Sequence, residues 1–128
     1  MAEMLFGMHS GTRYLVLLAG IVATIAVIAG SVRGKATRGA ALSSRIFLIL
    51  LDVQVLLGIA LVVVWPFHGA LIGHIVMMVL AVASGHGLAV AVRRRPADAP
   101  TAGLQLAAVL VPLILVIGGI LAIGRPIV

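Results

Sequence analysis

Long apolar runs separated by short polar gaps dominate this sequence. A helix rises about 1.5 Å per residue, so roughly 20 apolar residues cross a hydrocarbon core of about 30 Å. Four runs have this length, and they cover residues 14–32, 46–65, about 69–92 and 104–123. They are longer than barrel strands and do not alternate apolar with polar positions, which favours helices. The pattern predicts an all-α integral membrane protein whose 128 residues form one four-helix bundle.

The composition supports a membrane protein over a soluble one. Hydrophobic residues make up 63% of the chain and charged residues 9%, whereas a soluble domain has about half and about a quarter. The chain has no cysteine, which excludes disulfides, iron–sulfur clusters and thiolate metal sites. The lipid bilayer is therefore the first expected partner.

The basic residues indicate an orientation. Seven of the nine Lys and Arg residues lie in the gaps after the first and third spans, namely Arg33, Lys35, Arg38, Arg45, Arg93, Arg94 and Arg95. Because Lys and Arg concentrate in short cytoplasmic loops, both gaps are expected inside the cell. An up-down-up-down bundle then has both termini outside. Basic loops beside anionic lipid headgroups also account for the net charge of +6, so no nucleic-acid partner is expected.

Asp52 and His86 are expected to meet between the second and third spans. The gap joining these spans, "WPFHG", is short, which predicts an antiparallel hairpin. Asp52 lies seven residues after Arg45 and His86 seven residues before Arg93, so both lie about 10 Å inside the cytoplasmic end. The pair has two interpretations: a proton-handling or histidine-orienting pair, and a buried polar contact that holds two helices together.

A second polar site is predicted near the outer side. His74 lies 12 residues from His86, about 18 Å along the axis and about 120° around it, so the two cannot share one metal. His9, just before the first span, is expected at the depth of His74. Two histidines from different helices can hold haem iron inside a bundle. In the alternative interpretation, His9 lies among headgroups and His74 bonds a neighbouring backbone.

Small residues near His74 fit the haem hypothesis. Ala81 and Gly85 follow His74 at i+7 and i+11, on one helical face that would admit a flat macrocycle. Arg13 follows His9 at i+4, where it would meet a haem propionate. A face of small residues is equally explained by close helix packing.

Three segments resemble a known family. They are "HSGTRYLVLLAG" (9–20), "DVQVLLG" (52–58) and "HIVMMVLAVASGHG" (74–87), and they are similar to small bacterial four-span membrane proteins, some of which are labelled cytochrome-b-like. The residues that match its pattern are His9, Arg13, Gln54, Gly58, His74 and His86. Asp52 stands where some relatives have histidine, which would form a second pair with His86. The resemblance implies a multi-pass protein of the bacterial cytoplasmic (inner) membrane.

Three functions remain open from the sequence. The first is a membrane subunit linked to electron transfer, with one b-type haem between the first and third helices. The second is a non-catalytic accessory subunit that packs against other membrane subunits of a larger complex. The third is a small ion or drug transporter, which rests on Asp52 because the first span has no carboxylate. No nucleophile elbow or Gly-rich phosphate loop is present, so no catalytic activity of its own is expected.

Overall fold

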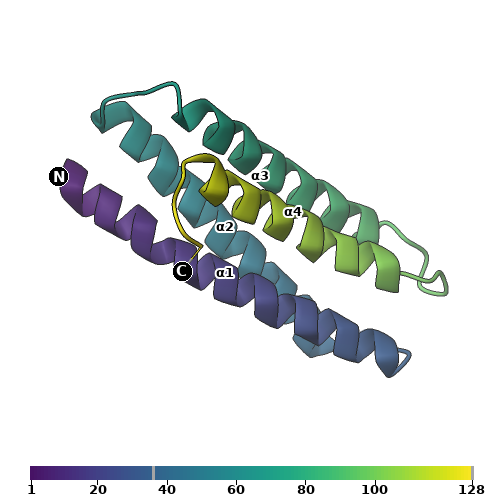
Figure 1. Ribbon diagram of the computed structural model, residues 1–128. Coiled ribbons are helices and arrows are strands. Elements are labelled where there is room, and N and C mark those ends of the chain that lie inside the picture. The colour runs from purple at the N-terminus through teal and green to yellow at the C-terminus, as the bar shows by residue number, and fades with distance from the viewer. Residues whose placement is uncertain (36, 128) are drawn as a thin grey trace.

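The chain folds into long helices joined by short connections (Figure 1). The computed structural model describes residues 1–35 and 37–127. Within these residues the elements are α1 (Ala2–Val32), α2 (Arg38–Val64), α3 (Leu71–Arg93) and α4 (Ala102–Ala122), and no strand occurs. All four helices are long and apolar enough to cross a membrane. The prediction of an all-α fold is confirmed, with four helices that have the length and hydropathy needed to span a membrane.

Two helices begin earlier than their apolar runs. α1 begins at Ala2 rather than near residue 14, so His9 lies inside the helix and not before it. Residues 2–13 contain no proline, and the negative charge of Glu3 in the first turn interacts favourably with the helix dipole. α2 begins at Arg38 because the Thr37 side chain accepts a hydrogen bond of 3.1 Å from the Ala40 N–H. Hydropathy therefore predicted the four apolar runs but not the residues at which α1 and α2 begin.

The helices pack mainly as two pairs, α1 with α2 and α3 with α4, joined through α1 and α4. α2 and α3 contact each other least among these pairs. In a bilayer such packing is stabilised by close contact rather than by removal of apolar surface from water. Gly20 shows how close it is, because a Cβ there would lie 2.7 Å from Leu113 and 3.1 Å from Phe47. The core includes Val16, Val27, Phe47, Leu51, Ala81, Val109 and Leu113.

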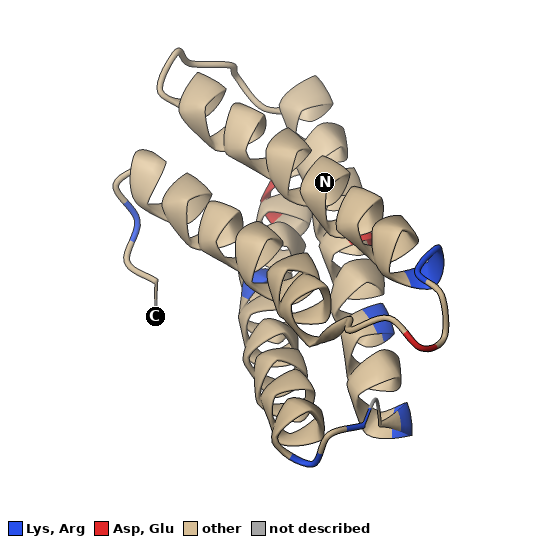
Figure 2. Ribbon diagram, turned by 90° about the vertical axis from the view of Figure 1, so that its right-hand side faces the viewer, with Lys and Arg blue, Asp and Glu red and all other residues tan. Residues whose placement is uncertain are grey.

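The two ends of the bundle differ in charge. Figure 1 shows the α1–α2 connection and the 94–101 connection at one end, with the 65–70 connection and the start of α1 at the other. Figure 2 shows that Lys and Arg gather mainly on and beside the first two connections. The segment that follows α4 turns back beside α1. The end of the bundle with the 65–70 connection therefore brings together the start of α1, the end of α2, the start of α3 and the segment after α4.

Candidate functional site

A cavity of about 570 Å³ lies at this end of the bundle, lined by all four helices and by the segment after α4. Its volume falls within the roughly 300–1,000 Å³ of small-molecule sites. Most of its lining surface is apolar, and three of its lining residues on α2 and α3, Ile59, Val63 and Val79, are exposed. The imidazole and guanidinium groups on its wall belong to His9, His68, His74, Arg13 and Arg125.

His74 is oriented by the backbone of α4. Its Nδ1 lies 2.8 Å from the carbonyl oxygen of Gly119. A carbonyl only accepts hydrogen bonds, so Nδ1 carries the proton and donates it, which leaves a lone pair on Nε2. Gly119 permits this approach, because a Cβ there would lie 2.6 Å from Met78 and 3.4 Å from the imidazole. A metal-binding histidine is usually held in this way through its second nitrogen.

His9 is held in a similar way by α2. Its Nδ1 lies 3.2 Å from the carbonyl oxygen of Gln54, which accepts its proton. The buried Gln54 amide donates to the carbonyl of His9 at 2.8 Å, and Thr12 donates to the Gln54 side-chain oxygen. Gly58 leaves room for the ring, because a Cβ there would lie 3.1 Å from His9 Cε1. Two polar groups and one absent side chain thus determine where the His9 ring lies.

The distance between the centres of the two imidazoles is the one expected for two histidine ligands of a single iron. Their ring centres are 6.2 Å apart and their planes differ by 85°. A metal–imidazole bond is about 2.0–2.1 Å long and the ring centre lies roughly 1.1 Å further, so two axial imidazoles have centres about 6 Å apart. The Gln54 amide also lies 3.4 Å from His9 Nε2. That long contact is the one that iron ligation would replace.

Arg13 lines the cavity one turn after His9. Its guanidinium donates to the Tyr14 hydroxyl at 2.6 Å and lies 4.6 Å from the centre of that ring. Its Nε is buried and has no hydrogen-bond partner among the described residues. A buried donor without a partner costs free energy, and the guanidinium is held instead by its two contacts with Tyr14.

Sequence reasoning missed several residues of this site. Arg125, which follows α4, lines the cavity, and Gln54 and Gly58 shape it around His9. Gln54 and Gly58 had one signal, since they belong to the motif shared with the resembling family. Arg125 had a weaker one, as a basic residue just beyond the last apolar run.

Ala81 and Gly85 do not line the cavity, contrary to expectation. Ala81 is fully buried in the core, and a Cβ on Gly85 would lie 2.7 Å from Leu48 and 3.5 Å from Pro112. Both lie about 10 Å or more along α3 from His74. They serve helix packing, which was the alternative explanation, whereas Met78 takes their place at the cavity wall.

The structure brings Asp52 and His86 together. His86 Nε2 lies 2.8 Å and 3.0 Å from the two carboxylate oxygens of Asp52. The pair is not buried in the bundle, because the side chains are 41% exposed for Asp52 and 48% for His86. The expectation of a buried contact is therefore wrong. The pair sits on the surface of two membrane-spanning helices that hardly pack on each other.

No group of three or more His, Cys, Asp or Glu side chains that could hold a metal ion lies within residues 1–35 and 37–127. No family model, curated protein or solved structure matches this chain.

Proposed function

We propose that the protein binds one b-type haem between His9 and His74 and transfers electrons within the membrane. The observation that carries this proposal is the imidazole pair, whose ring centres lie 6.2 Å apart in the cavity. Backbone carbonyls accept both Nδ1 protons, which leaves the two Nε2 atoms for the iron. With no cysteine in the chain, the haem would be held without covalent attachment.

The roles of the protein residues follow from this geometry. Bound haem supplies one-electron chemistry. His9 and His74 would bind the iron, and the carbonyls of Gln54 and Gly119 orient the two imidazole rings. The aliphatic wall excludes water from the ring, and Arg13 offers a donor to a propionate. No residue in this arrangement is needed as an acid, a base or a nucleophile.

We further propose an up-down-up-down bundle in a bacterial cytoplasmic membrane, with both termini outside. The support is that most Lys and Arg residues lie on or beside two connections (Figure 2), and both connections are at the same end of the bundle (Figure 1). The haem site then lies in the outer half of the membrane.

The absorption spectrum tests the haem proposal directly. The protein, expressed with ample haem and purified in mild detergent, should show a sharp α-band in the green after reduction with dithionite. His74→Ala should abolish this band because the iron loses an axial ligand. His86→Ala is the matched control on the same helix, and it should keep the band. A wild type without the band, or a band lost only in His86→Ala, would refute the site.

The second candidate function is an accessory subunit of a larger membrane complex. It is favoured by the Asp52–His86 pair, which exposes polar atoms on the surface of two apolar helices. Polar groups inside a bilayer are costly unless they face protein or water. Co-purification from native membranes tests this candidate. A stable assembly that Asp52→Ala and His86→Ala weaken equally would support it, whereas a monomer in every detergent would not.

A further inference from the structure

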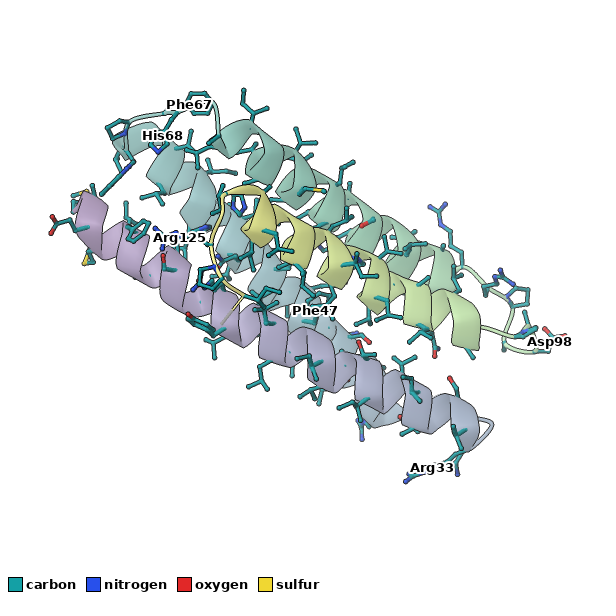
Figure 3. All side chains as sticks on the ribbon, viewed as in Figure 1. Arg33, Phe47, Phe67, His68, Asp98 and Arg125 are labelled. Carbon is teal, nitrogen blue, oxygen red and sulfur yellow. The ribbon has the colours of Figure 1, made fainter. Side chains whose placement is uncertain are left out.

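Two arginines lie on the wall of the same cavity without a carboxylate partner. Arg13 comes from α1 and Arg125 from the segment after α4. The ion pair found among the described residues joins His86 to Asp52 and involves neither arginine. Figure 3 shows Asp98 at the opposite end of the bundle from the part of α1 that Arg125 adjoins. Glu3, on α1 one turn before Phe6, forms no ion pair with either arginine among the described residues, so no salt bridge within them holds Arg13 or Arg125.

Aromatic rings hold both guanidinium groups in place. The Arg125 guanidinium lies 4.8 Å from the centre of the Phe6 ring, and Phe6 stacks on Trp65 at 5.7 Å. Phe6, Trp65 and Arg125 all line the cavity, so this stack links α1, the end of α2 and the segment after α4. Arg13 lies over the ring of Tyr14. Stacking leaves the edge of the Arg125 guanidinium free to bind a carboxylate with two hydrogen bonds, whereas Arg13, which already donates to Tyr14, has its other terminal N–H groups for this purpose.

We propose that Arg13 and Arg125 together bind the two carboxylates of one ligand, so that the cavity selects a flat, apolar dianion. The inference rests on the proposed haem site, since haem b carries two propionates on one edge of its ring. It adds a requirement that histidine ligation does not impose. Two cations on one apolar cavity wall repel each other, and a bound dianion would remove this repulsion by accepting charge-assisted hydrogen bonds from the accessible guanidinium N–H groups.

A comparison of charged and neutral ligands tests this requirement. The whole chain, purified without haem in a detergent free of phospholipid, is titrated with haemin and with haemin dimethyl ester. Wild type should bind haemin about tenfold or more tightly, because charge-assisted hydrogen bonds are lost in the ester. Arg13→Gln and Arg125→Gln should each reduce this preference and leave affinity for the ester nearly unchanged. Arg33→Gln, a basic residue at the other end of the bundle, is the matched control.

An iron-free arm separates this proposal from the proposed function. Protoporphyrin IX and its dimethyl ester, followed by fluorescence, test the arginines without histidine ligation. A preference for the diacid that both Gln variants reduce supports the arginine pair even if haemin gives no six-coordinate spectrum. Equal binding of acid and ester would overturn it even if haemin binds through His74. Loss of co-purified phosphatidylglycerol in the variants, with no change in the acid-to-ester ratio, would assign the arginines to lipid phosphate and also overturn it.

Discussion

At the scale of single residues, the position of the His9 ring depends on a missing side chain. A Cβ on Gly58 would lie 3.1 Å from His9 Cε1, which is tighter than a normal contact, so Gly58→Ala should push the His9 ring away from the position in which it could bind iron. Haemin affinity should fall roughly tenfold, about 1.4 kcal/mol, with little change in helix content. Absorbance titration measures the effect.

Gly73→Ala is the control for this substitution. Gly73 also lies near this end of the bundle, but its added Cβ would meet Ala122 at an ordinary 3.6 Å, so haemin affinity should not change. Equal haemin affinities for wild type and Gly58→Ala would show that the His9 ring does not need this space, and would argue against His9 as a ligand of the iron.

The Asp52–His86 pair offers a second test at this scale. The two side chains are hydrogen-bonded but almost half exposed, so the expected coupling is modest. Hydrogen bonds between membrane helices contribute about 0.6 kcal/mol on average and up to about 1.7. A double-mutant cycle with Asp52→Ala and His86→Ala should give a coupling of this size in the free energy of unfolding in detergent. Additive losses would mean that the two residues do not interact in the folded protein.

The residues that could and could not be predicted differ in a physical way. Asp52 and His86 could be paired because each lies seven residues from an arginine at the same expected membrane surface, which gives both the same expected depth. Ala81 and Gly85 could not be placed, because helical spacing gives their face but not the depth at which a cavity ends. Arg125 reaches the site through the fold of a segment beyond the last helix, and no periodicity in the sequence reports that fold.

At the scale of elements, the early start of α1 matters most. The helix runs from Ala2 through His9, so the backbone of His9 is held in a continuous helix. Gly7→Pro should remove one of these bonds and clash with the preceding turn, at a cost of about 3 kcal/mol. We expect the reduced α-band to be lost or strongly diminished while most of the helical circular dichroism remains.

The same position supplies the control. Gly7→Ala adds a Cβ that meets nothing within 4 Å, and alanine is the better helix former by about 0.5–1 kcal/mol. The band should therefore be retained in Gly7→Ala. A full band in Gly7→Pro would show that residues 2–8 need not be helical for the site to form.

At the scale of the whole molecule, the class of fold followed from composition and run length, but the packing order did not. The short 65–70 connection suggested a tight hairpin of α2 and α3, yet these helices contact each other less than α1 does α2, or α3 does α4. A short connection limits only the distance between the two helix ends it joins, and residues of both helices line the cavity near that connection. The spacing of apolar residues does not show where the helices leave a cavity. Each helix satisfies its own backbone hydrogen bonds, so its sequence is compatible with either close or loose packing against a neighbour.

The orientation in the membrane is the remaining prediction at this scale. The chain has no cysteine, so a single introduced cysteine reports its own position without background. Gly69 lies in the 65–70 connection, exposed and with nothing within 4 Å of an added Cβ, and Ala97 is exposed in the 94–101 connection. Since short basic loops stay in the cytoplasm, an impermeant maleimide should label Gly69→Cys in intact cells, and Ala97→Cys only after the membrane is permeabilised. Circular dichroism of each purified variant confirms that it is folded. The reverse labelling would place the imidazole pair in the inner half of the membrane, whereas labelling of both from outside would mean that the chain inserts in two orientations.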